Sequence, residues 1–165
     1  MGLCSIIILT YNALDYTKLC IQSIFKHTAY PYELIMVDNG STDGTLTFLN
    51  HVSALKSKTG FFDTETGFRG APASVFSYRD SSRYETTPAP FLKRPRRVVV
   101  IKNTKNLGFA PGSNQGAAVA AGDSLLFLNN DTIVTKNWLQ NLHYCLNSQP
   151  LIGAVNPCSN FNRRR

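Results

Sequence analysis

The sequence has 165 residues, 43% of them hydrophobic, which is enough for one domain with a sizeable apolar core. The net charge of +7 suggests nucleic-acid binding, but seven of the 17 basic residues lie in two runs, at 93–97 and 163–165. The other ten balance the ten acidic residues. This argues against a broad basic surface and favours two solvated or disordered runs. Contact of these runs with phosphates or an anionic membrane stays open.

No stretch of the sequence indicates a cysteine metal site or a membrane span. The four cysteines have no metal-type spacing and no C-x-x-C pair. Three of them lie in or beside apolar segments, as buried free thiols do, which indicates a reducing compartment. No apolar run approaches the roughly 18 residues of a spanning helix, and no signal peptide is recognisable. We therefore expect a cytoplasmic protein and leave open peripheral contact with the inner face of the membrane.

The first part of the chain predicts two strand–helix pairs. A β-branched apolar run at 4–9 predicts a buried strand, and a helical pattern follows to about residue 27. A second apolar run at 33–37 precedes a helical pattern from about 45 to 55. This order specifies a right-handed β-α-β unit and a parallel sheet. The caps are expected just after the strands: Asn12 or Asp15 for the first helix, Thr42 or Asp43 for the second.

Residues 57–95 interrupt this alternation. The segment is rich in Ser, Thr, Gly, Pro, Arg and aromatic residues, without a clear period. A loop of this length in a compact domain is usually functional or disordered, and the aromatic residues favour a partly ordered flap. We expect a mobile insert, near the ligand-binding edge, in a domain that spans residues 4–160 and precedes a basic tail at 161–165.

The second part of the chain continues the α/β pattern. The expected elements are a strand at 98–102, a Gly-rich loop at 106–116, a helix of small residues at 117–121, a strand from 125, an amphipathic helix at 138–146 and a strand that begins within 151–155. The uninterrupted apolar run at 125–128 predicts a strand buried on both faces. The glycines of the loop recur every four residues, which does not fit a dinucleotide-binding fingerprint.

Polar side chains follow four of the predicted strands. Tyr11 can stack on a base, Asp38 can accept a hydrogen bond from a base N–H or a sugar hydroxyl, and Asp131 can bind a divalent cation with phosphate. In a parallel sheet these strand ends meet at the ligand-binding edge. The sequence therefore predicts a nucleotide site there. Turn formation or helix capping is the alternative for each Asn and Asp.

Four stretches in this order carry a resemblance. They read Ile-Ile-Leu-Thr-Tyr-Asn at 7–12, Val-Asp-Asn-Gly-Ser-Thr-Asp-Gly-Thr at 37–45, Asn-Leu-Gly-Phe-Ala-Pro-Gly-Ser-Asn-Gln-Gly at 106–116, and Leu-Asn-Asn-Asp-Thr at 128–132. Together they resemble the donor-binding half of family 2 glycosyltransferases, a group that includes many rhamnosyl and other cell-surface sugar transferases. The resemblance implies a Rossmann-like GT-A fold, a three-layer α/β sandwich with a mainly parallel central sheet.

The resemblance also implies roles for particular residues. Thr10 and Tyr11 would flank the nucleobase, Asp38 would bind the base or ribose, and Asp131 would hold Mg²⁺ or Mn²⁺ on the diphosphate. Asn replaces the first carboxylate of the family's Asp-x-Asp motif, which leaves one strong metal ligand. The full set of implied donor-binding residues is Thr10, Tyr11, Asn12, Asp38, Asn39, Asn106, Gly108, Asn114, Asn129 and Asn130.

The implied reaction moves a sugar, with inversion, from a nucleotide-diphosphate sugar to a hydroxyl of a glycan, a lipid-linked acceptor or a protein. The family's catalytic base is a carboxylate well downstream of the Asp-x-Asp position. All ten acidic residues lie at or before Asp131, and the chain ends at Arg165. We therefore expect a C-terminally truncated chain with no catalytic residue of its own, whose base would lie downstream of Arg165. The alternatives are a non-catalytic nucleotide-sugar-binding fragment and a basic RNA-binding domain.

Overall fold

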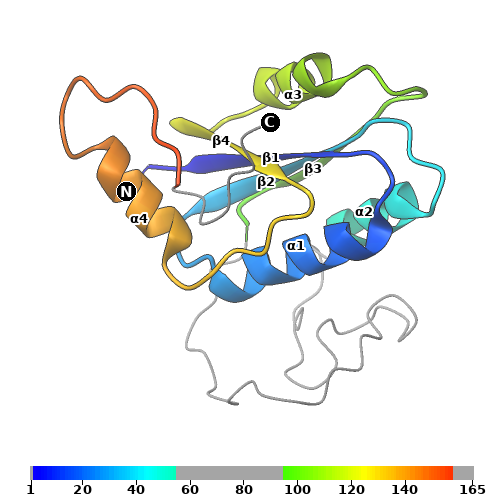
Figure 1. Ribbon diagram of the computed structural model, residues 1–165, viewed down its shortest axis with the longest axis horizontal. Helices are drawn as coiled ribbons and strands as arrows, with labels where there is room; N and C mark the ends of the chain where they lie inside the picture. Colours follow the sequence, from blue (N-terminus) through cyan, green and yellow to red (C-terminus); the bar gives the residue numbers. More distant parts are fainter. Residues whose placement is uncertain (1, 55–94, 158–165) are drawn as a thin grey trace, which may run out of the picture.

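The computed structural model describes residues 2–54 and 95–157, which form a layered α/β fold (Figure 1). The expected insert at 57–95, apart from its last residue, and the basic tail that ends at Arg165 lie outside these residues. The elements in chain order are β1 (Cys4–Thr10), α1 (Leu14–His27), β2 (Tyr32–Asp38), α2 (Thr45–Ala54), β3 (Val98–Lys102), α3 (Phe109–Ala118), β4 (Ser124–Asn129) and α4 (Trp138–Leu146).

The four strands form one parallel sheet in the order β3-β2-β1-β4. Helices α1 and α2 lie on one side of the sheet and α3 lies on the other (Figure 1). The predicted α/β fold with a three-layer arrangement is therefore confirmed. Among the described residues, no helix has both the length and the apolar character that a membrane crossing requires.

Side chains from alternate positions of the central strands enter two separate apolar cores. Ile6 and Ile8 of β1 pack with the α1 and α2 side, whereas Ile7 packs with Ile35 and Val37 on the α3 side. Because both faces of β1 and β2 are covered, their sequences are almost continuously apolar. The two cores therefore hold from both sides the strands whose carboxyl ends carry the candidate site.

Helix α3 begins earlier than the sequence predicts. The Gly-rich stretch was predicted as a loop, but residues 109–118 are helical. Two glycines explain why: a Cβ at Gly112 would lie 2.5 Å from Leu9 Cδ1, and one at Gly116 would lie 2.5 Å from Ile7 Cγ2. The spacing of four puts both glycines on one face of the helix, so α3 can lie directly against β1.

Substitution of Gly116 by alanine should therefore destabilise the protein. The added methyl group collides with the branched side chain of Ile7, and overpacking of this kind costs about 1–3 kcal/mol. That exceeds the roughly 1 kcal/mol by which alanine is favoured over glycine in a helix. We expect a lower Tm for Gly116→Ala and little change for Gly153→Ala, where no described atom beyond the adjacent residues lies within 4 Å of the added Cβ. Equal melting temperatures for the two variants would contradict this packing account.

Strand β4 differs from its prediction because it is an edge strand. The apolar run was expected to be buried on both faces, but Leu125 and Phe127 are 48% and 51% exposed. Their neighbours Leu126 and Leu128 pack against the α1 side core. Within the described residues β4 pairs with β1 alone, and the face that carries Leu125 and Phe127 is only partly covered.

Two further expectations are wrong. The strand that was to begin within 151–155 does not form: residues 152–157 have no regular secondary structure, and Leu151 is 97% exposed. The inference of buried thiols holds for Cys4 and Cys20, but Cys145 is exposed on α4. In both places apolar residues occur in the local sequence, but no layer among the described residues buries them.

Candidate functional site

The carboxyl ends of the strands place the candidate residues along one edge of the sheet. Thr10 lies opposite Asp38 in the register of β1 and β2, and Leu9 lies opposite Asn129 in the register of β1 and β4. The ends of β2 and β4 are therefore separated by two strand spacings, about 10 Å. One extended nucleotide can reach both positions.

Asp38 is a buried carboxylate whose hydrogen bonds within the protein leave acceptor positions unoccupied. Its side chain lies at the end of β2, and the residue is 1% exposed. One carboxylate oxygen accepts from the Ser41 N–H at 3.2 Å, and the other lies 3.5 Å from the Thr10 hydroxyl. A carboxylate offers about four acceptor positions, so Asp38 can accept a further N–H or O–H. The ring of Tyr11, on the same edge, is 52% exposed and open to stacking.

Asn12 joins the two loops that follow β1 and β2. Its backbone N–H donates to the Ser41 hydroxyl at 2.8 Å, and its side-chain oxygen accepts from the Thr42 N–H at 2.8 Å. Asn12 has a positive φ of 56°, in the left-handed region that Asn tolerates better than most residues. In this arrangement the Asn12 amide oxygen supports the loops that carry Tyr11 and Asp38.

Asp43 connects the starts of both helices. One oxygen accepts from the Leu14 N–H at 2.9 Å, and the other accepts from the Thr45 N–H at 3.0 Å. Burial alone would raise the pKa of Asp43, but the hydrogen bonds from Thr45 and Leu14 hold it below its usual value. The expected cap of α2 by Asp43 is confirmed. The expected cap of α1 is wrong, because no side chain caps that helix at Ala13.

Asn39 fastens the loop between β3 and α3. Its side-chain nitrogen donates to the Asn106 side-chain oxygen at 2.8 Å and to the Gly108 carbonyl at 3.2 Å. Its side-chain oxygen accepts from the Leu107 N–H at 3.0 Å and from the Asn103 amide at 3.1 Å. Asn39 and the oxygen of Asn106 are therefore engaged within the protein itself.

The three polar residues in the turn after β4 have two different roles. Asn130 and the backbone of Asn129 bond to α1, whereas the side chains of Asn129 and Asp131 are exposed. The Asn130 amide donates to the Thr17 hydroxyl of α1 at 3.0 Å. The Cys20 thiol, also on α1, donates to the Asn129 carbonyl at 3.6 Å. Burial raises the pKa of Cys20 to about 12, and the Asp131 charge adds to the rise, so the thiol keeps its proton. The side chains of Asn129 and Asp131 remain exposed at the edge.

The carboxylates of this edge suit a cation that is bound partly by the protein and partly by a ligand. Among the described residues there is no group of three His, Cys, Asp or Glu side chains that could enclose a metal ion. The exposed Asp131 carboxylate makes no hydrogen bond or ion pair within that part of the chain. Mg²⁺ in phosphate-binding sites typically takes one or two carboxylates and completes its shell with phosphate oxygens and water, which fits a single free aspartate.

Asn114 stands apart from the other candidates. It lies two residues after Gly112 on α3, on the side of the helix that turns away from the sheet, and it is exposed.

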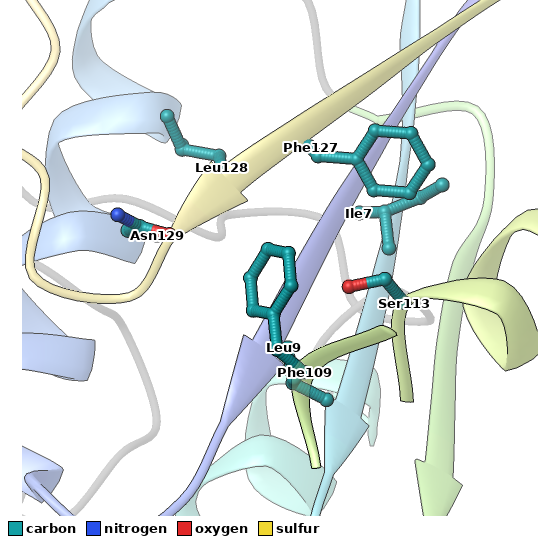
Figure 2. Close-up of a pocket in the computed structure, with 7 residues that line it drawn as sticks. All are labelled: Ile7, Leu9, Phe109, Ser113, Phe127, Leu128 and Asn129. Atoms are coloured by element: carbon teal, nitrogen blue, oxygen red, sulfur yellow. The ribbon is translucent and has the colours of Figure 1, made fainter. Parts of the chain in front are cut away.

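A shallow hollow lies between β1, β4 and the start of α3 (Figure 2). Its walls are mainly apolar, and Ser113 and Asn129 supply its polar groups. This hollow is separate from the position of Asp38.

Some residues of this edge were not predicted as site residues. Ser41, Thr17 and Gln115 each hold a candidate residue or its neighbour in place. Ser41 lies within the second motif and Gln115 within the third, so their positions in the motifs were available as a signal. Thr17 lies inside a helix without any motif, and only the contact between α1 and the β4 turn reveals it.

Comparison with known proteins assigns the chain to a class of transferases. The model of the family Glycosyl transferase family 2 matches residues 5–76 and 75–155. The chain therefore belongs to glycosyltransferase family 2. The two matched segments meet within the stretch that was expected to be an insert.

Two curated relatives are similar over most of the chain. An uncharacterised glycosyltransferase of Haemophilus influenzae is 25% identical over 153 residues, 93% of this chain and 35% of the relative. The glycosyltransferase GlyG of Streptococcus pneumoniae serotype 4 is 25% identical over 141 residues, 86% of this chain and 34% of the relative. The chain thus spans about a third of the length of these relatives.

Solved glycosyltransferase structures share the fold. A mannosyltransferase from Pyrobaculum calidifontis, in complex with GDP-Man and Mn²⁺, superposes with a TM-score of 0.61 at 18% identity, over 90% of this chain and 33% of that one. TarS residues 1–349 from S. aureus, in complex with UDP-GlcNAc, superposes with a TM-score of 0.56 at 20% identity, over 88% of this chain and 31% of that one. The similarity supports the GT-A assignment of the sheet and its helices.

Proposed function

We propose that this chain binds the nucleotide-diphosphate sugar of a family 2 glycosyltransferase along the edge where β1, β2 and β4 end. One observation carries the proposal: this edge presents a buried, incompletely paired carboxylate at Asp38, where β2 ends, and an exposed carboxylate at Asp131, in the turn after β4, which has no hydrogen bond or ion pair within the described residues. Asp38 accepts from the base or ribose, and the ring of Tyr11 stacks on the base. The relatives and fold neighbours support a sugar nucleotide as the ligand.

The metal ion, the acceptor and a base complete the proposed reaction. Asp131 would hold Mg²⁺ or Mn²⁺, which offsets the negative charge that develops on the departing diphosphate. An acceptor hydroxyl forms a bond to the anomeric carbon from the face opposite the diphosphate, and the bond from that carbon to the phosphate oxygen breaks, so the configuration inverts. The acceptor proton passes to a carboxylate base, which we propose lies well downstream of Asp131, as the resemblance to the family implies.

Calorimetric titration of the chain with UDP and with GDP, each with and without Mn²⁺, tests the proposal. We expect one nucleotide to bind at a single site and Mn²⁺ to tighten that binding. The absence of binding by both nucleotides in the presence of Mn²⁺ would refute the proposed function for this chain. Formation of a glycosylated acceptor would then separate a transferase from a non-catalytic nucleotide-sugar-binding protein that uses the same residues.

A further inference from the structure

Four side-chain amides form a continuous network behind the candidate site. Asn39 follows β2, Asn103 follows β3, Asn106 lies in the loop between β3 and α3, and Gln115 lies in α3. Asn39 and Asn103 are buried. The four side chains are joined to one another by hydrogen bonds of 2.8–3.1 Å. Elements that are far apart in the sequence are thereby tied together at one point of the sheet edge.

The pairing of Asn103 with Gln115 is reciprocal. The Asn103 nitrogen donates to the Gln115 oxygen at 2.8 Å, and the Gln115 nitrogen donates to the Asn103 oxygen at 3.1 Å. These two bonds use one donor hydrogen and one acceptor oxygen of each amide. The Asn103 nitrogen can therefore present its second hydrogen to the side-chain oxygen of Asn39, 3.1 Å away.

The backbone of the loop sets the orientation of Asn39, because the Leu107 N–H can only donate and the Gly108 carbonyl can only accept. With its oxygen directed to Asn103 and the Leu107 N–H, Asn39 has its nitrogen free for Asn106 and the Gly108 carbonyl. A flipped Asn39 amide would bring N–H groups against N–H groups at Asn103 and Leu107. The Asn103–Gln115 pair supports this orientation, because it holds the Asn103 nitrogen against the Asn39 oxygen.

The loop that this network fastens lies against the residues that follow Asp38. A Cβ at Gly40 would be 2.9 Å from the Lys105 backbone, and Gly40 has a positive φ of 86°. The backbone N–H of Asn103 also donates to the backbone carbonyl of Asp38 at 2.8 Å. Loop 105–108 and the backbone of Asp38 are therefore held as one unit.

We propose that Asn103 and Gln115 are positioning residues of the nucleotide site. Their paired amides hold Asn39 in the orientation that keeps loop 105–108 against Gly40, beside the residues that follow Asp38. The inference rests on the proposed function, since it assigns the loop to the wall of the nucleotide site. Neither residue needs to touch the nucleotide. Their effect is to keep a wall of the site in one conformation before the ligand arrives, which reduces the ordering cost of binding.

The test compares Gln115→Met, Gln115→Glu and the unmodified chain. Methionine has a similar length but no amide, so both bonds to Asn103 are lost. Glutamate keeps an acceptor for the Asn103 nitrogen but sets its second, charged oxygen against the Asn103 oxygen. Backbone hydrogen exchange at Leu107 and Gly108 should accelerate in Gln115→Met, because their bonds depend on Asn39 and Asn106. The affinity for UDP or GDP with Mn²⁺, whichever binds the unmodified chain, should fall on the order of 10-fold in both variants.

Trp138→Phe is the control for a general loss of stability. It removes the 2.9 Å hydrogen bond from the Trp138 ring nitrogen to the Thr28 hydroxyl, away from the site, and should leave the exchange of the loop and the nucleotide affinity unchanged. Unchanged exchange at Leu107 and Gly108 in Gln115→Met would overturn the inference by itself. Faster exchange with unchanged nucleotide affinity would overturn the positioning role but leave the proposed function intact. If the unmodified chain binds neither nucleotide, the proposed function fails, and the assignment to a nucleotide site fails with it.

Discussion

Replacement of Asp38 by asparagine should weaken nucleotide binding by roughly 10–100-fold, since hydrogen bonds to a charged group contribute about 1.5–3 kcal/mol. The substitution is nearly isosteric, and its oxygen can still accept from the Ser41 N–H that the carboxylate engages. What it removes is the negative charge and the acceptor capacity that the protein leaves unused. Calorimetry with UDP or GDP and Mn²⁺ measures the loss, and thermal unfolding verifies that the variant is folded.

Asp15→Asn is a matched control for the change in net charge. Asp15 is exposed on α1, and its carboxylate pairs with Lys18 at 3.2 Å. This variant should bind the nucleotide as the unmodified chain does. If Asp38→Asn retains full affinity while the unmodified chain binds, Asp38 does not read the base or ribose and the ligand lies elsewhere along the edge.

The sequence predicted the parts of the fold that depend on local patterns. β-branched runs gave the first two strands within a residue of their observed ends and the strand at 98–102 without error. The motifs then identified the edge of the sheet that carries the candidate residues. These features are predictable because strand burial and turn chemistry are written in adjacent residues.

The features that the sequence did not predict depend on neighbours in space. The run at 125–128 has the composition of a strand covered on both faces, and only the sheet order shows that it lies at an edge. The Gly-rich stretch resembles a loop until the close approach of Gly112 and Gly116 to β1 is seen. Helix α1 lacks a local cap because Asp43 from the next loop bonds to the Leu14 N–H instead.

The same distinction applies within the candidate site. Asn12, Asn39, Asn106 and Asn130 have hydrogen-bonding partners inside the protein, whereas Tyr11, Asp131 and part of the Asp38 carboxylate face outward or have capacity to spare. A motif specifies which residue types recur at a strand end. It does not state whether each amide supports the loop or binds the ligand. The direct ligand-binding roles proposed for these asparagines stay predictions that substitution has to test.

Asp131→Asn should abolish most of the effect of Mn²⁺ on nucleotide binding while leaving metal-free binding nearly unchanged. Asp131 is exposed and has no hydrogen bond or ion pair within the described part of the chain, so the substitution breaks no internal contact. Loss of a residue that merely supports a metal ligand typically costs about 10–100-fold in metal affinity, and loss of the ligand itself should cost at least as much. Titration of UDP or GDP at several Mn²⁺ concentrations measures this dependence directly, without an acceptor or turnover.

Asp123→Asn is the control because it makes the same change in charge at the opposite end of β4. Asp123 is exposed and accepts from the Leu3 N–H at 2.7 Å, so it lies where no ligand is proposed. If both variants lose the Mn²⁺ effect equally, the ion acts through the overall charge of the protein. If neither loses it, the nucleotide brings its cation without help from Asp131. Loss in Asp131→Asn alone places the cation at the turn after β4, where one carboxylate can hold it only together with the diphosphate, so Mn²⁺ alone should bind weakly.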